Sequence, residues 1–442
     1  MNKTDRRSYL VIVVLFLAVM LAVANLPFKV KPFGDITFHA EAKTLALFLK
    51  GQVPAWQVAI TKAPGPVLFF TPAYLLAPAD APDETLWYFG VAMSTVLVCL
   101  AMVLVFKTVK KLFGLGIAWL TIALFAVFPI HCYYSLGIVA EVPAFFSLTL
   151  GLYGWTLMTQ NADSRKALTY FTLGFLGLLL NRPNAMLFLP LVVVVLGGAY
   201  IWRREYFKRY AKPLLLSVFV IFVVGFGILS AAKSISRQGD SQDNLLYYVA
   251  HQGRFQFREE PLNFNFWDND FREGTPDYDN WKKSNAQLHQ VMKAESRTYA
   301  DVFRQWLIDD AVAHPFWFLR QSVIKAFYGH IYFINSVSPK EFKMGPFAGQ
   351  WAYYSLLVAV NVVNLLILTG VAVYLLRDKI MGQTWPFWGI WLVLIAFHAL
   401  TYMEPRYLFP AKAALYPLSA AGLYQIGFVR QSFDRFLKFF IR

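Results

Sequence analysis

The chain has 442 residues, of which 57% are hydrophobic and only 15% are charged, and this composition excludes a soluble globular protein. The net charge of +15 does not indicate a nucleic-acid partner, because the tract 232–350 holds 14 Lys and Arg against 14 Asp and Glu, and the basic excess lies in the short connections and tails. Basic residues distributed in this way are typical of the cytoplasmic loops of a polytopic membrane protein.

The first hydrophobic segment follows a basic N-terminus. Residues 1–8 are basic and Tyr9–Leu26 is a continuous apolar run, which predicts a helix whose N-terminal end lies in the cytoplasm. Ala22-Val23-Ala24 has the small-x-small form of a signal-peptidase site, so a cleaved signal peptide is the alternative for this segment.

The first long connection is predicted to lie outside the cytoplasm. The second span, Leu86–Phe106, ends in a lysine cluster at 107–111, which belongs on the cytoplasmic side and therefore places the loop 28–85 outside. Phe38–Leu49 and Pro66–Leu76 within this loop are apolar but too short to span a bilayer. We expect them to be helices that lie at the outer membrane surface.

Eight further spans follow from the same alternation of basic and less basic connections. They are Leu115–Ile130, Val142–Met158, Leu168–Leu180, Ala185–Trp202, Leu214–Ala231, Trp351–Leu376, Trp385–Leu400 and Tyr407–Val429. The sequence thus predicts an all-α polytopic membrane protein of about ten spans. Its predicted parts are a transmembrane module 1–231, an outer tract 232–350 and C-terminal helices 351–442. If the number of spans differs from ten, we expect the difference at the segment 314–333.

The outer tract carries an amphipathic pattern. Apolar residues recur at helical spacing at Leu288, Val291, Met292, Tyr299, Val302, Phe303, Trp306 and Leu307. This pattern predicts one helix that ends at the His314-Pro315 step. A structural cap over the membrane helices is favoured over direct substrate contact.

Polar and ionisable side chains near the outer ends of the spans are the candidates for function, because burying them at membrane depth is costly. They are Asp35, His39 and Glu41 in the first loop, Lys62 in ITKAPGP, Glu141 in IVAEVPAF, Arg182 in LLLNRPNAM, and Arg406 and Lys412 in MEPRYLFPAKAALYP. A carboxylate can take the proton from an attacking hydroxyl, and fixed cations can stabilise a departing phosphate. An apolar groove between helices would hold a lipid tail on that phosphate.

The carboxylates also have structural explanations. Asp35 would equally be a solvated loop residue, and Glu141 lies in the first helical turn beside Pro143, where the helix dipole favours an acid. His39 is more often a satisfied polar contact than a metal ligand. Asp35, His39 and Glu41 would be the ligands of a divalent cation if one were bound, but no metal or other cofactor is expected.

The cations differ in how easily they are explained. Lys62 and Arg182 could extend to lipid headgroups, which is the commoner fate of a cation near the end of a span. Lys412 lies six residues beyond Arg406, roughly 9 Å along a helix. That depth is unusual for a cation without a role.

The common signatures of soluble enzymes are absent. The sequence has no GxxxxGK[ST], HExxH or GxGxxG pattern, and its two cysteines, Cys99 and Cys132, form neither a disulfide framework nor a metal site. No cytoplasmic segment is long enough for a nucleotide-binding domain. The active face is therefore expected outside, where nucleotide-activated substrates are scarce.

Five segments together resemble a known family. They are GDITFHAEA, KAPGPVLFF, EVPAFF, NRPNAMLFLP and EPRYLFPAKAALYP. The chain resembles the polytopic glycosyltransferases of the C superfold (GT-C), which use polyprenyl-phosphate sugars and include the protein O-mannosyltransferases and the lipid A aminoarabinose transferases. The resemblance covers the N-terminal half and the last span, and the tract 232–350 matches nothing in it.

The resemblance implies roles for four residues. Asp35 would be the catalytic base, Glu141 a second acid at the acceptor side, and Lys62 and Arg406 the ligands of the donor phosphate. Two positions depart from the family. Ile36 replaces a second acid that many relatives carry, which weakens the case for a metal, and Ala63 replaces the first proline of a Pro-Pro pair.

The function expected from these residues is transfer of a sugar from a polyprenyl phosphate to a hydroxyl of a lipid, glycan or protein, with inversion at the anomeric carbon. A transporter or flippase of lipid-linked sugars is the alternative, and an O-antigen polymerase or ligase is a third reading, for which the large outer tract leaves room. The tract 232–350 contains no N-x-[ST] sequon, which favours a bacterial inner membrane with the active site facing the periplasm. Membrane lipids are expected as partners.

Overall fold

Helices dominate the structure. The computed structural model describes residues 3–24, 33–61, 63–78, 81–128, 130–160, 165–182, 204–235, 241–259, 271, 273–330, 343–344, 347–377, 381–403 and 405–440. Within these ranges, β-structure is limited to two pairs of two-residue strands. The predicted all-α architecture is confirmed.

The chain divides into two compact units. The first comprises Met1–Ser236, Val362–Val393 and Phe409–Arg442, and the second comprises Arg237–Asn361 and Leu394–Leu408. The predicted outer tract 232–350 falls almost entirely in the second unit, which also takes up a short segment from near the C-terminus.

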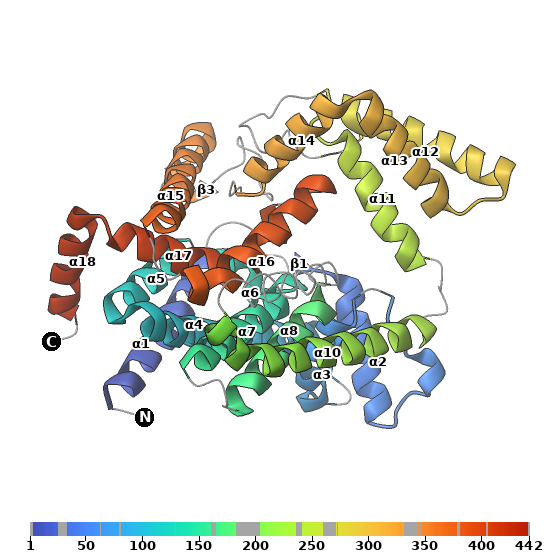
Figure 1. The fold of residues 1–442 in the computed structure, drawn as a ribbon. Coiled ribbons are helices and arrows are strands. Elements are labelled where there is room, and N and C mark those ends of the chain that lie inside the picture. The colour runs from blue at the N-terminus through green and yellow to red at the C-terminus, as the bar shows by residue number, and fades with distance from the viewer. Residues whose placement is uncertain are drawn as a thin grey trace. The chain divides into compact units, whose positions relative to one another are not determined.

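The first unit contains most of the apolar helices (Figure 1). Its elements are α1 (Lys3–Ala24), β1 (Phe33–Gly34), α2 (Ile36–Leu49), η1 (Ala55–Gln57), α3 (Pro64–Leu76), α4 (Asp83–Phe113), α5 (Leu115–Val127), α6 (Ile130–Ser135), β2 (Gly137–Ile138), α7 (Glu141–Gln160), α8 (Arg165–Asn181), α10 (Arg204–Ile235), α17 (Lys412–Tyr424) and α18 (Gly427–Phe440).

The second unit is built from shorter helices. Its elements are α11 (Ser241–Phe255), α12 (Pro276–Glu295), α13 (Tyr299–Ala313), α14 (Pro315–Tyr328), β3 (Lys343–Met344), β4 (Phe347–Ala348) and η3 (Pro405–Leu408). Two long helices, α15 (Gly349–Arg377) and α16 (Met381–Leu400), contribute residues to both units.

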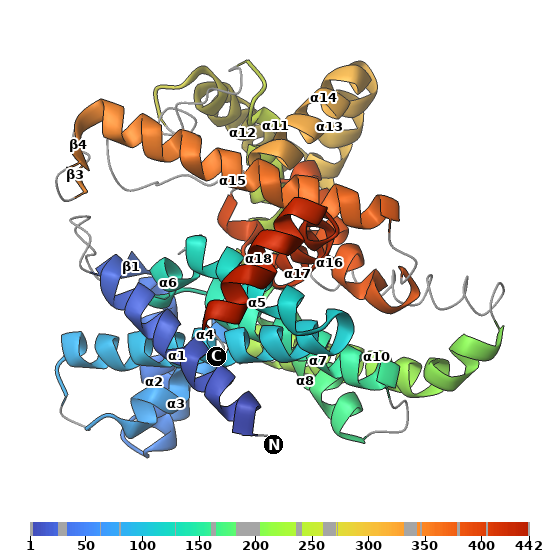
Figure 2. The same cartoon turned by 90° about the vertical axis from the view of Figure 1, so that its left-hand side faces the viewer.

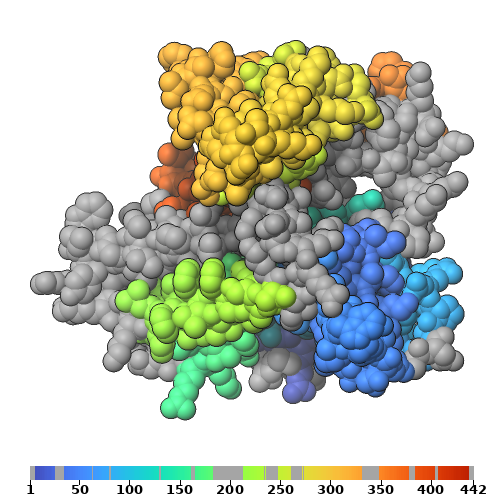
Figure 3. All heavy atoms as spheres, turned by 90° about the vertical axis from the view of Figure 1, so that its right-hand side faces the viewer, coloured from blue at the N-terminus to red at the C-terminus, as the bar shows by residue number. Residues whose placement is uncertain are grey.

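Four helices of the described part are long and apolar enough to cross a membrane. They are the segments Asp5–Ala24, Asp83–Phe113, Pro213–Ala232 and Gly349–Arg377. Helix α10, light green in Figure 3, lies at the surface of the protein, and its apolar side chains Leu215, Leu216, Phe219, Phe222, Val223 and Phe226 are all exposed. A surface of this kind suits contact with lipid, so the chain is an integral membrane protein. The predicted span Ala185–Trp202 lies outside the described residues.

Among the described helices of the first unit, α7 and α8 pack against each other most extensively (Figures 1 and 2). A Cβ atom on Gly174 would lie 2.5 Å from Gly151 Cα, and one on Gly154 would lie 2.8 Å from Phe171 Cα. Small residues at such positions let two backbones approach, which is how membrane helices gain packing without a hydrophobic driving force. This pair places Glu141 at the start of α7 and Arg182 just past the end of α8.

Two predicted helices are interrupted. The amphipathic pattern of the tract forms two helices, α12 and α13, because Ser296 adopts a left-handed conformation (φ 53°) and Thr298 caps α13 by accepting a hydrogen bond from Asp301 N. The predicted end at the His314-Pro315 step is confirmed.

The predicted last span, Tyr407–Val429, is not one helix. Pro410 lies between η3 and α17, where its missing N–H and its restriction of the preceding residue prevent a continuous helix. The helices α17 and α18 are separate, and both pack on α5 (Figure 2).

Candidate functional site

A two-stranded parallel pairing joins two of the sequence motifs in the first unit. Strand β1 of GDITF pairs with β2, with Gly34 opposite Ile138, and Asp35 N donates to Ile138 O at 2.9 Å. Gly34 has φ +146°, and a Cβ there would lie 2.6 Å from the carbonyl oxygen of Ile138. Only glycine fits this approach, so the Gly-Asp pair places Asp35 beside the segment that leads into Glu141.

Asp35 also caps a helix. It is the N-cap residue of α2, and its Oδ1 accepts a hydrogen bond from Thr37 N at 3.0 Å. The side chain is partly exposed. A half-exposed carboxylate with a fixed orientation can both cap the helix and accept a proton from a bound hydroxyl.

Glu141 and Arg182 form an ion pair across the α7–α8 helix pair. Arg182 Nη2 lies 2.5 Å from Glu141 Oε1, and the Glu141 residue is buried. Because burying either charge alone is costly, each residue depends on the other. The structure thereby brings the EVPAFF and NRPNAM motifs together, and it indicates that Arg182 holds Glu141 in addition to any role in substrate binding.

The KAPGP motif lies against the same place. A Cβ on Gly65 would lie 2.5 Å from the backbone nitrogen of Asn181, so this glycine lets the start of α3 approach the end of α8. Asn181 is buried, its Nδ2 donates to Gly177 O at 2.7 Å, and its Oδ1 has no partner among the described residues. Lys62 itself lies outside the described residues.

Glu41 holds the loop that precedes Lys62. Its Oε1 accepts hydrogen bonds from Thr61 N at 2.8 Å and Thr61 Oγ1 at 2.5 Å, and the residue is buried. Glu41 was expected among the substrate-binding residues. This geometry gives it a position from which it orients the Lys62 loop.

His39 is a packed polar contact. Its Nδ1 lies 2.9 Å from Tyr74 Oη, its Nε2 lies 4.0 Å from Asp83 Oδ1, and its ring packs on Trp87. Burial lowers the pKa of His39, and the opposing effect of the Asp83 charge is smaller. Asp83 is itself paired with Lys43.

The three polar residues of the first loop do not share one ligand site. Asp35 turns to Thr37, His39 to Tyr74 and Glu41 to Thr61. Across the part of the chain that the structure describes, no group of three or more His, Cys, Asp or Glu residues is arranged to hold a metal ion.

The C-terminal motif is divided between the units. The backbone of Arg406 lies in η3, which belongs to the second unit, and its side chain is outside the described residues. Lys412 opens α17 in the first unit, where it is buried with its Nζ 6.0 Å from the Phe128 ring centre and 5.9 Å from that of Tyr416.

The second unit contains a polar network that the sequence patterns do not predict. Arg254, Gln256, Gln321 and Lys325 are all buried and hydrogen-bonded to one another or to nearby backbone. Arg254 lies on α11, Gln321 and Lys325 lie on α14, and Gln256 lies in the turn after α11. Because the tract 232–350 contains equal numbers of basic and acidic residues, its sequence does not distinguish these four side chains from solvent-exposed ones.

These observations define an all-α integral membrane protein in which contacts join four N-terminal motifs, with Asp35 next to the segment that leads to Glu141 and Glu141 paired with Arg182. No protein-family model and no curated protein matches the chain. Among solved structures, it is similar to ArnT from Cupriavidus metallidurans, in crystals bound to undecaprenyl phosphate and in the apo state. Identities are 15% and 16%, and both alignments cover 92% of this chain and 77% of the ArnT chain with a TM-score of 0.37. A TM-score at this level does not establish a shared fold, so the assignment of the site rests on the residues above.

Proposed function

We propose that this chain is a membrane glycosyltransferase of the GT-C type, which moves a sugar from a polyprenyl phosphate to an acceptor hydroxyl on the non-cytoplasmic face of a bacterial inner membrane. The observation that supports the proposal is the β1–β2 pairing, which joins the backbone of Asp35 to the segment 137–138 that leads to Glu141. Glu141, three residues beyond Ile138, is paired with Arg182.

The proposed chemistry is a displacement at the anomeric carbon. Asp35 takes the proton from the acceptor hydroxyl as the oxygen of that hydroxyl bonds to the anomeric carbon. The bond from that carbon to the phosphate oxygen breaks, and the configuration inverts. The departing polyprenyl phosphate gains negative charge, which Arg406 and Lys62 stabilise. Glu141, held by Arg182, orients the acceptor.

The substitution Asp35→Asn tests the role of the base. Asparagine caps helices about as well as aspartate, so α2 keeps its N-cap while the proton acceptor is lost. We expect turnover to fall by roughly 10²–10⁴, while the thermal unfolding temperature and the affinity for undecaprenyl phosphate stay near wild type. The measurement is sugar transfer and lipid binding on the same purified protein.

A matched control is Asp83→Asn. Asp83 is an exposed carboxylate at the start of α4, paired with Lys43, and its loss should leave turnover unchanged. Wild-type turnover of the Asp35→Asn variant would show that Asp35 is not the catalytic base.

A further inference from the structure

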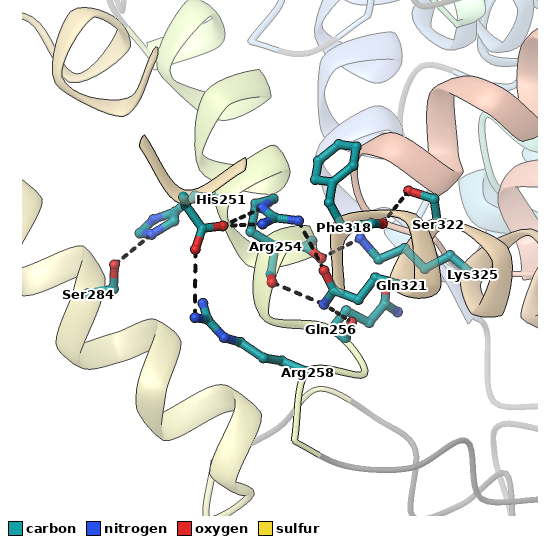
Figure 4. A network of polar contacts seen from close by, with 11 residues as sticks. His251, Arg254, Gln256, Arg258, Ser284, Phe318, Gln321, Ser322 and Lys325 are labelled. Carbon is teal, nitrogen blue, oxygen red and sulfur yellow. Dashed lines mark hydrogen bonds and ion pairs between the residues drawn. The ribbon is translucent and has the colours of Figure 1, made fainter. Parts of the chain in front are cut away.

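Four of the buried polar side chains in the second unit belong to one hydrogen-bonded network (Figure 4). Arg254, Gln256, Gln321 and Lys325 are between 1% and 3% exposed. Buried polar groups cost free energy unless they are hydrogen-bonded, and the cost is larger for charges. Their partners therefore show what this network holds in place.

Arg254 joins three helices of the unit. Its Nε donates to Asp310 Oδ2 at 2.9 Å, its Nη2 contacts the same oxygen, and its Nη1 donates to Gln321 Oε1 at 3.1 Å. The guanidinium also lies 4.6 Å from the ring centre of Phe318. These contacts fix the end of α11 against α13 and α14.

Gln321 holds the turn that follows α11. Its Nε2 donates to the carbonyl oxygens of Arg254 at 3.1 Å and Gln256 at 2.6 Å. In this turn Phe257 has φ +59°, a conformation that a phenylalanine adopts only when its surroundings impose it. These hydrogen bonds fix the backbone that carries the side chain of Gln256.

The side chain of Gln256 forms two hydrogen bonds with the backbone of Met403, a residue far along the chain. Its Nε2 donates to Met403 O at 2.7 Å, and its Oε1 accepts from Met403 N at 3.0 Å. This pairing satisfies both backbone groups of Met403, a residue that is itself buried. A single amide side chain thus fixes the position and rotation of Met403.

Two further contacts hold the residues just before Met403. Lys325 Nζ donates to Thr401 O at 2.7 Å and also contacts Gly253 O. Gly253 packs so closely that a Cβ there would lie 2.8 Å from Tyr402 N and closer still to Thr401. The segment 401–403 is therefore held by α11, by its following turn and by α14.

We propose that this network is a clamp that positions the Arg406 segment, with Gln256 and Lys325 as positioning residues for the donor phosphate. Helix η3 begins two residues after Met403 and carries Arg406. This proposal depends on the proposed function in one respect, namely that Arg406 binds the donor phosphate. In this proposal the outer tract determines the position of Arg406. Directional hydrogen bonds fix the position of a backbone more narrowly than apolar packing does.

The test compares the clamp with a purely structural role in the tract. Gln256→Met removes both bonds to Met403, and Ser284→Ala is the matched control, since it removes one buried bond to His251 inside the tract and none to 401–403. Lys325→Met is a second variant in case Gln256→Met does not fold, because an apolar side chain of similar length replaces a buried charge.

Two readouts on the full-length chain in lipid nanodiscs separate the possibilities. Amide hydrogen exchange of peptides covering 401–408 should rise in Gln256→Met and Lys325→Met and stay at the wild-type level in Ser284→Ala. Binding of undecaprenyl phosphate should weaken about tenfold in the clamp variants, with little further loss when Arg406→Ala is added, because coupled residues are not additive. Binding of undecaprenol, which lacks the phosphate, should be unchanged.

Unchanged exchange at 401–408 in the folded clamp variants would overturn the clamp. Raised exchange with wild-type binding of undecaprenyl phosphate, or losses that add fully to that of Arg406→Ala, would overturn its positioning role. Wild-type binding in Arg406→Ala alone would instead count against the proposed function, and the exchange readout would still decide whether the clamp exists.

Discussion

At the scale of single residues, the site depends on a glycine as much as on its carboxylates. Gly34 has a backbone conformation that side chains rarely adopt, and it also contacts the backbone of Ile138 too closely for any Cβ. Gly34 allows β1 to pair with β2, and this pairing fixes where the backbone of Asp35 lies. The sequence marks Asp35 as a candidate, whereas the reason for Gly34 becomes visible only when both strands are seen.

We expect Gly34→Ala to disrupt the β1–β2 pairing and to reduce turnover strongly. The new methyl would meet backbone atoms that cannot move aside, in addition to a strain of roughly 1 kcal/mol or more at positive φ. Gly51→Ala is the control, because Gly51 also has positive φ (+73°) but has open space around its Cβ position. Thermal unfolding and turnover of both variants measure the difference, and equal effects would contradict this account.

The free energy of unfolding should depend on pH through the protonation of His251. Its Nδ1 lies 2.9 Å from Tyr299 Oη and its Nε2 lies 3.0 Å from Ser284 Oγ, and burial lowers its pKa to about 4. Between pH 4 and about 6.5 the unfolded chain binds the proton and the folded chain does not, so stability is complete above this window and falls as the pH drops through it.

The expected loss is at most about 3 kcal/mol across that window. Unfolding temperatures of the purified chain at a series of pH values from 4 to 7 would show it. His251→Gln should flatten the slope, while His314→Gln, which changes an exposed histidine, should leave the slope as in wild type. A slope that survives His251→Gln would assign the proton to another group.

At the scale of elements, sequence patterns predict where helices form better than where they break. Apolar runs identify α7, α8 and α15 to within three residues, whereas α4 continues seven residues beyond the predicted end at Phe106. The break at Ser296 was missed because the apolar spacing continues through it. A local signal was present in Thr298 and Asp301, which have the spacing of a capping box.

The candidate site shows the same limit of prediction. Its carboxylates and cations stand out in the sequence because they are polar residues near the ends of apolar runs. The contacts that assemble them, such as Glu41 with Thr61 or Gln256 with Met403, join residues far apart in the chain. Hydropathy and spacing within one segment do not contain that information.

The α7–α8 pair supplies a prediction at this scale. In Gly174→Val, the new side chain would meet backbone atoms of Gly151 and Ser147, which no rotamer change relieves. We expect no stable monodisperse protein, since the pair has no looser packing that keeps Glu141 near Arg182. Gly227→Val on α10 is the control, because nothing lies within 4 Å of its Cβ position. Size-exclusion profiles and unfolding temperatures would separate them, and a well-folded Gly174→Val would show that the helices can move apart.

At the scale of the whole molecule, the two units differ in surface chemistry. The first contains three of the long apolar spans in full, and the second contains short helices with charge-rich faces. The basic excess lies outside the tract 232–350, which has balanced charge. This asymmetry predicts that the loop after α2 and the tract share the non-cytoplasmic side.

Labelling of single cysteines in intact cells would test that topology. Gln52 is exposed in the loop after α2, and Gln160 is exposed at the end of α7. Gln52→Cys should react with a membrane-impermeant maleimide, and Gln160→Cys should react only after the membrane is permeabilised. The native Cys99 and Cys132 are buried and should give little background. The reverse labelling pattern would invert the topology and remove the basis for an outer active site.

The division of the second unit between 237–361 and 394–408 has a consequence for biosynthesis. A ribosome makes the tract well before it makes Thr401 and Met403, and α15 and α16 are translated in between. During that interval Gln256 lacks its backbone partner Met403, and Lys325 lacks Thr401 O, one of its two backbone partners. The second unit therefore reaches its final form only after translation has passed residue 408. A chain truncated before that point would carry a tract with unsatisfied buried polar groups, which is the kind of defect that membrane proteases remove.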